Sequence, residues 1–200
     1  MYAVTKLNDT DLRPSRVIST FDRPQILAIS GIYELPFGKG KQWLAHGRMA
    51  DLAFGGWQLQ AIYQVQSGQP IDFPELFFYG DPKTIALSSD KRSVDEWFNV
   101  DAGFQRNSNL VPANHIRTFP LRFSAVRSSG INNLKASAIK NIHIREGVQF
   151  QLRAEAVDVT NAAVFAVPNT TPTSTSFGQV TGMRNNGTQR RITFLGKLTW

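Results

Sequence analysis

Apolar and polar residues alternate at every second position along three stretches of this 200-residue chain, over residues 57–66, 148–157 and 191–200. A period of two sends successive side chains to opposite faces of an extended strand, so each stretch predicts a β-strand with one apolar and one polar face. Further strands are expected over residues 25–35 and 133–145. No stretch of useful length follows the helical period, so the sequence predicts an all-β fold.

The expected strand over residues 133–145 is less regular than the others. Lys135 and Lys140 fall on opposite faces of it, which breaks the separation into an apolar and a polar side. Two interpretations stay open: a β-bulge in this strand, or a strand that runs past the apolar zone.

The regular strands and the links between them have the dimensions of a membrane barrel. Each run has about ten residues, against roughly 5–6 in an ordinary strand and roughly 9–11 in one that crosses a bilayer at a tilt. Shorter links over 35–55 and 145–147 alternate with long ones over 69–131 and 159–188. Short periplasmic turns and long extracellular loops are typical of transmembrane β-barrels. We therefore expect an antiparallel meander of about five long strands with two long extracellular loops.

Charge decides which face of this sheet meets lipid. A Lys or Arg that faces lipid at mid-membrane costs about 2–4 kcal/mol, so Arg153 and Lys197 are expected to face the lumen. The residues expected to line the lumen are Gln58, Gln60, Gln64, Gln66, Gln149, Gln151, Arg153, Glu155 and Lys197. The residues expected to face lipid are Trp57, Leu59, Tyr63, Val65, Phe150, Leu152, Phe194 and Leu198.

Several short motifs occur in a fixed order between residues 16 and 200. They are Phe21-Asp22-Arg23-Pro24, the segment from Ser30 to Lys41, Gly55-Gly56-Trp57-Gln58-Leu59, Ser67-Gly68-Gln69-Pro70, Trp97-Phe98-Asn99, Ile139-Lys140-Asn141, Leu152-Arg153-Ala154-Glu155, Thr160-Asn161 and Phe177-Gly178. In this order they resemble the C-terminal barrel of Oar-like TonB-dependent outer-membrane receptors. The resemblance implies that residues 1–200 form the C-terminal part of such a barrel. About five strands cannot close even an eight-stranded barrel, so a fragment of a larger receptor is expected.

The resemblance also implies a location and a set of partners. The location is the outer membrane of a Gram-negative cell, and the partners are its lipid, the missing N-terminal barrel and plug of the parent chain, and TonB through that parent only. The last strand is similar to the signal by which the barrel-assembly machinery recognises its substrates, carried by Ile192, Phe194, Leu198 and Trp200. The full-length receptor is expected to take up a chelated metal, an oligosaccharide or a peptide.

Other functional classes find little support. The chain has no cysteine, which excludes disulfides, thiolate metal sites and cysteine nucleophiles. His46, His115 and His143 lack metal-ligand spacing, so neither a metal nor another cofactor is expected, and no enzyme activity either. The net charge of +7 comes from scattered Lys and Arg residues, so nucleic-acid binding is not expected.

Two alternatives remain open from the sequence. One is a secreted β-sandwich that acts as a carbohydrate-binding or adhesion module, in which two layers would bury the apolar strand faces. The other is an extracytoplasmic hydrolase, for which no nucleophile and base are apparent. In the loops, Phe73, Phe77, Phe78 and Tyr79 are expected to pack rather than to bind a ligand, and residues 168–176 are expected to be too poor in apolar side chains to join a core.

Overall fold

The computed structural model describes residues 1–8, 13–43, 47–112, 115–184 and 189–200. The chain divides into two compact units, each described here by itself. The loop unit comprises Met1–Ile26, Gln66–Ile131 and Ala163–Gly187, and the sheet unit comprises Leu27–Val65, Asn132–Ala162 and Thr188–Trp200.

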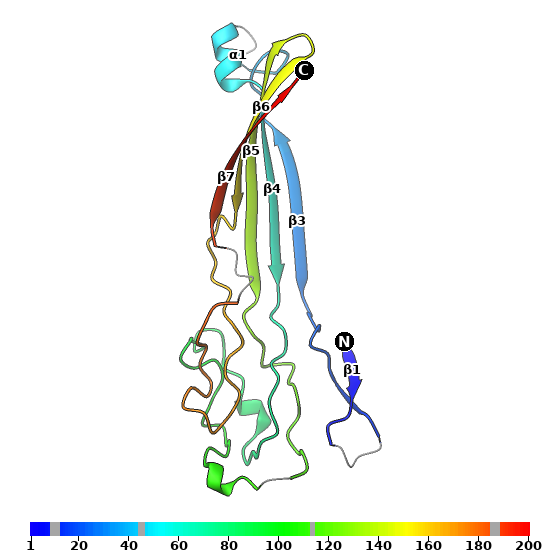
Figure 1. The fold of residues 1–200 in the computed structure, drawn as a ribbon, viewed down its shortest axis with the longest axis vertical. Coiled ribbons are helices and arrows are strands. Elements are labelled where there is room, and N and C mark those ends of the chain that lie inside the picture. The colour runs from blue at the N-terminus through cyan, green and yellow to red at the C-terminus, as the bar shows by residue number, and fades with distance from the viewer. Residues whose placement is uncertain (9–12, 44–46, 113–114, 185–188) are drawn as a thin grey trace. The chain divides into compact units, whose positions relative to one another are not determined.

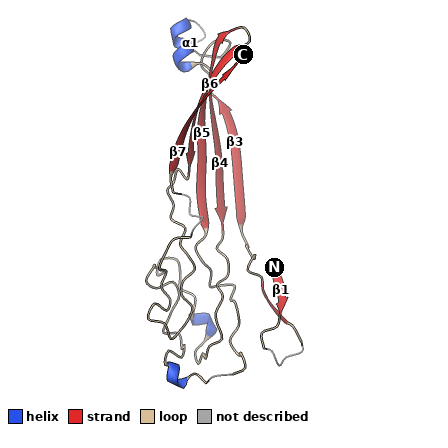
Figure 2. Cartoon of the chain, viewed as in Figure 1, coloured by secondary structure: helices blue, strands red, loops and turns tan. Residues whose placement is uncertain are grey.

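Five strands form one sheet in the order in which they follow along the chain (Figure 1). They are β3 (Ile26–Glu34), β4 (Trp57–Gln66), β5 (Ile131–Arg145), β6 (Val148–Val157) and β7 (Arg191–Thr199). Figure 2 shows that nearly all the regular structure is strand, as the alternation predicts. The expected antiparallel five-stranded meander is therefore confirmed, with strand ends within two residues of those predicted.

The register of the sheet aligns the polar positions of neighbouring strands. Gln151 of β6 lies opposite Asn141 of β5 and Lys197 of β7. Residues directly opposite each other in an antiparallel pair lie on the same face, so the polar positions of the three strands share one side of the sheet.

The pairing of β5 with β6 shows where the irregular strand departs from a regular register. It runs without interruption from Ala136 opposite Ala156 to His143 opposite Gln149. No shift of register occurs within these pairs, so Lys140 lies in a regularly paired part of the strand. The register shifts only between His143 and Arg145, beside the tight turn that joins the two strands.

A short helix that the sequence analysis did not predict lies in the link between β3 and β4. It is α1 (Arg48–Phe54), and the Gly55 N–H closes its last turn on the Asp51 carbonyl oxygen at 2.8 Å. Seven residues give no readable helical period, and a helix of this length depends on tertiary contacts for its stability. In the described part of the chain, no helix has the length and apolarity needed to cross a membrane.

The loop unit contains the second, smaller sheet of the described chain, also not predicted. Here β1 (Tyr2–Thr5) pairs antiparallel with β2 (Ser15–Ile18). Two single helical turns follow in the first long loop, η1 (Pro82–Thr84) and η2 (Ser108–Leu110).

The hydrophobic core of the described residues lies in the loop unit rather than on the sheet. Phe73 is fully buried, and its ring packs edge-on against Phe98 and Phe119 at centroid distances of 5.3 and 5.5 Å. The core consists of Ile71, Phe73, Leu76, Ile85, Trp97, Phe98, Ala102, Phe104, Phe119, Val126 and Phe177. The predicted packing is confirmed for Phe73 and for Phe78, which contacts this core, whereas Tyr79 is exposed.

No residue of 168–176 belongs to this core, as expected, although the segment is well ordered. Pro172 is buried, and the segment leads directly into the buried Phe177. Polar contacts order it: the Asn169 amide donates to the Ser174 and Ser176 hydroxyls, each at 2.9 Å. Apolar content therefore underestimates how well this segment is fixed, because side-chain and backbone hydrogen bonds replace apolar contacts.

Candidate functional site: the polar face of the sheet

A row of polar side chains crosses the sheet at mid-strand. Ser137 of β5 lies opposite Glu155 of β6, which lies opposite Thr193 of β7. Gln60 of β4 joins the row, since its Oε1 accepts hydrogen bonds from the Ser137 hydroxyl and from Arg153 Nη2, both at 3.3 Å. The structure thus brings together Gln60, Arg153 and Glu155, three of the residues predicted to face the lumen.

Arg153 is the centre of this row. Its Nη1 lies 3.2 Å from Glu155 Oε1, while its Nε is buried without a hydrogen-bond partner among the described residues. Both side chains of the ion pair are partly exposed, so the pair contributes at most about 1 kcal/mol. The ion pair holds the Arg153 guanidinium close to the polar face of the sheet.

A second polar contact lies further along the same face. Gln151 Nε2 donates to Asn141 Oδ1 at 2.8 Å, and the register places Lys197 opposite Gln151. Ser137, Asn141 and Thr193 also lie on this face, although they are not among the residues predicted to line the lumen. In a regular strand every second residue from Lys135 lies on one face, and this rule assigns Ser137 and Asn141 to the polar face.

The remaining glutamines follow the same parity. Gln58, Gln64 and Gln66 are separated from Gln60 by an even number of positions along β4, so they lie on the same face as Gln60. Gln149 of β6 lies opposite Thr199 of β7. The structure therefore places all the predicted lumen-facing residues on one face by strand parity. That this face lines a lumen remains a prediction.

A small hollow lies on the polar face beside Arg153. It has a volume of about 270 Å³ and is lined in part by Gln60, Ile62, Lys135 and Glu155. Ligand pockets usually enclose about 300–1,000 Å³, so this hollow resembles an uneven channel wall more than a complete binding site.

The opposite face carries the side chains predicted to meet lipid, and it is open. Phe194 is 79% exposed and Leu59 43% exposed, and Leu152 and Leu198 are exposed as well. A β-sandwich would bury these side chains between two layers, so the exposures do not fit that alternative. Trp57, Tyr63, Val65 and Phe150 lie on this face by parity and are partly buried.

A shallow apolar hollow of about 600 Å³ occupies the middle of this second face. Tyr33, Leu59 and Ile192 are among the residues that line it. Small residues also line it, namely Gly31, Ala61, Ala136, Ala138, Ala154 and Ala156. Nearby, the Phe150 ring covers Gly196, where an added Cβ would lie 3.5 Å from Phe150 Cζ.

The histidines do not come together. His143 is in β5, and His115 stacks on Phe77 at 4.2 Å and lies 3.7 Å from Glu75, whereas His46 lies outside the described residues. Within the ranges that the structure describes, no three His, Asp or Glu side chains are grouped to hold a metal ion.

Comparison with known families supplies the identification. A family model described as an outer membrane beta barrel domain matches residues 3–193. The chain belongs to this family. The outer membrane beta barrel domain places the protein in the outer membrane and explains a sheet with one polar and one exposed apolar face. Searches of curated proteins and of solved structures found no match.

Proposed function

We propose that this outer membrane beta barrel domain is the C-terminal wall of an Oar-like TonB-dependent receptor, which in its full-length form takes up a ligand across the outer membrane. The ordered motifs and the family match support this proposal. The observation that carries it is the open, two-faced sheet: polar side chains converge on one face while large apolar side chains stand exposed on the other.

The edges of the sheet favour a fragment of a larger barrel. In a five-stranded meander the two edge strands, β3 and β7, run in the same direction. An all-antiparallel barrel needs an even number of strands, so an odd number must be added to close this one. Copies of this chain alone would join β7 to β3 in parallel. A 22-stranded transporter barrel would supply roughly 17 further strands.

The direction of the strands suggests an orientation. β7 ends at the same end of the sheet as the tight turn between β5 and β6, and the links β4–β5 and β6–β7 both leave from the opposite end. With short turns in the periplasm, the long links over 69–131 and 159–188 are extracellular. The exposed Trp200, the last residue of the proposed assembly signal, would then lie at the periplasmic end, and the exposed Phe194 would lie further along β7.

The proposed partners follow from this arrangement. They are outer-membrane lipid, the barrel-assembly machinery, the rest of the parent barrel with its plug, and TonB acting through that parent. We propose neither an enzymatic activity nor a cofactor for these residues.

Energy-dependent uptake tests the proposal. Cells with and without the gene are given a chelated iron, an oligosaccharide or a peptide in labelled form, before and after an uncoupler collapses the proton gradient. A TonB-dependent receptor accumulates one of these classes, and the uncoupler abolishes the accumulation. Entry that does not respond to the uncoupler would identify a passive pore and contradict the proposal.

A further inference from the structure

Two arginines of the loop unit converge on one neutral oxygen. Arg23 Nη2 donates to Gln69 Oε1 at 3.0 Å, and Arg184 Nη2 donates to the same oxygen at 3.3 Å. Like charges held this close repel each other unless an anion lies between them. We propose that this site, which we call the Arg23–Arg184 site, binds an oxyanion: the carboxylate or phosphate of a ligand. That the oxyanion belongs to an imported ligand rests on the proposed function, whereas the anion site itself does not.

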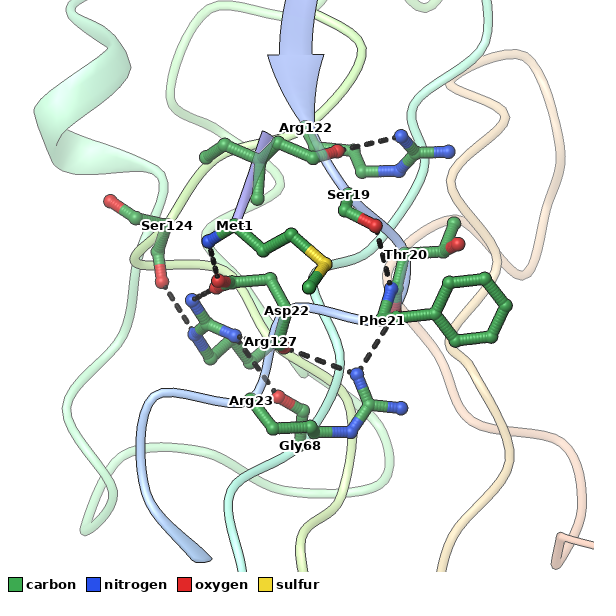
Figure 3. A network of polar contacts seen from close by, with 11 residues as sticks. Met1, Ser19, Thr20, Phe21, Asp22, Arg23, Gly68, Arg122, Ser124 and Arg127 are labelled. Carbon is green, nitrogen blue, oxygen red and sulfur yellow. Dashed lines mark hydrogen bonds and ion pairs between the residues drawn. The ribbon is translucent and has the colours of Figure 1, made fainter. Parts of the chain in front are cut away.

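The neighbouring carboxylate is already engaged (Figure 3). Asp22 Oδ2 accepts from Arg127 Nη2 at 2.7 Å, and its Oδ1 accepts from the Met1 amine at 2.5 Å. Arg127 therefore adds a third guanidinium close to Arg23, and Asp22 is already paired with it. The pKa of Arg23 lies below its ordinary value, because of burial first and then because of the positive charges of Arg184 and Arg127.

Arg184 has no carboxylate in its own stretch of the chain. Residues 159–200 contain neither Asp nor Glu. Among the described residues, its side chain donates one hydrogen bond, to Gln69 Oε1. Arg23 is fixed more firmly, since its Nη1 also donates to the Thr20 and Asp22 carbonyl oxygens at 2.9 and 3.1 Å.

Ser128, whose backbone is hydrogen-bonded to that of Gln69, carries an unsatisfied hydroxyl. The Ser128 N–H donates to the Gln69 carbonyl oxygen at 2.8 Å, so the two residues lie side by side. Ser128 is only 5% exposed, and its Oγ has no hydrogen-bond partner among the described residues. A buried hydroxyl without a partner is uncommon in proteins and is consistent with a missing polar ligand.

The hydrogen-bond donors of the site indicate that the ligand is an oxyanion, but this oxyanion has two possible sources. Guanidinium groups bind carboxylate and phosphate oxygens through two parallel hydrogen bonds, which favours these anions over chloride. At the outer membrane, such an oxyanion belongs either to a soluble ligand or to the phosphate of a lipid headgroup. The experiment therefore needs one arm for each source.

The test follows the arginine Nε–Hε signals of ¹⁵N-arginine-labelled protein by NMR, with the full chain in phosphate-free non-ionic detergent. Inorganic phosphate and acetate are titrated at constant ionic strength with chloride, and a second arm adds a phosphate-bearing lipid to the micelles. We expect saturable binding in the wild type. Competition between the lipid and inorganic phosphate would assign the site to the headgroup, and lack of competition would assign it to a soluble ligand.

Variants make the test specific. Arg184→Gln should weaken binding about tenfold or more, because it removes a charged donor, while Arg106→Gln, which changes an exposed arginine beside Asp101, should leave it unchanged. Gln69→Glu should abolish phosphate binding and raise the thermal stability of the loop unit, because it supplies the missing negative charge internally. Absence of saturation, or equal affinity in Arg184→Gln, would overturn the proposal whatever the uptake assay shows.

Discussion

The Lys140 ammonium lies 5.6 Å from the centre of the Trp57 ring, on the face of the sheet that carries Leu152. A lysine is unexpected on this apolar face. It is accommodated because its Nζ donates to the Gly55 carbonyl oxygen, where helix α1 ends. The C-terminus of a helix carries partial negative charge, so α1 and Lys140 stabilise each other. This contact anchors the β3–β4 link to the sheet.

Lys140→Ala should loosen that link. The substitution leaves the Gly55 carbonyl oxygen at the end of α1 without the Lys140 donor, at a cost of about 1–3 kcal/mol. Hydrogen exchange over residues 47–56 should then become faster. Lys135→Gln, an exposed lysine on the opposite face of β5, is the matched control and should leave exchange unchanged. Equal protection in Lys140→Ala and wild type would refute the anchoring role.

Phe73→Ala should destabilise the loop unit selectively. The side chain is fully buried among aromatic rings, and truncation of such a phenylalanine typically costs about 3–5 kcal/mol. Limited proteolysis should cleave within residues 66–131 sooner than in the wild type. Tyr79→Ala removes an exposed ring of the same loop and should have little effect. If both variants resist protease equally, the aromatic core does not hold the loop together.

Acid should weaken the loop unit through Asp22. The pKa of its carboxyl group lies below the ordinary 3.8, because the Met1 amine and then Arg127 donate hydrogen bonds to it. A lowered folded-state pKa stabilises the fold above pH 3.8, and this contribution is lost as the pH falls through the folded-state value. Near-ultraviolet circular dichroism should show an acid transition that Asp22→Asn removes and that Asp101→Asn leaves in place. A transition identical in all three proteins would exclude Asp22 as its cause.

The sequence predicted the sheet well because one physical rule governs it. In β4 and β6 every second side chain is apolar, and the predicted bounds of both strands match the structure. The rule missed α1 and the β1–β2 hairpin, which are too short to show a period. It also gave no access to the Arg23–Arg184 site, because Arg23, Gln69 and Arg184 are far apart in the chain and only the fold brings them together.

An arginine should impair membrane insertion when it is placed on the apolar face of β7, but not when it is placed on the polar face. Phe194→Arg puts a cation on the exposed apolar face, and near mid-membrane this costs about 2–4 kcal/mol of insertion free energy. Thr193→Arg puts the same group on the polar face beside Glu155 and should be tolerated. The inserted fraction of each variant in outer-membrane vesicles, after extraction with urea, measures the difference. Equal insertion would contradict the assignment of faces.

The most direct measurement maps the environment of each face in the membrane. The chain has no cysteine, so single cysteines can be introduced and labelled with an environment-sensitive fluorophore in outer-membrane vesicles. Labels at Leu59, Ala154 and Phe194 should be quenched by lipid-borne nitroxides, and labels at Gln60, Glu155 and Thr193 by aqueous iodide. Quenching that does not alternate between neighbouring positions, or iodide access at Leu59 and Phe194, would show that this sheet is not the wall of a membrane barrel.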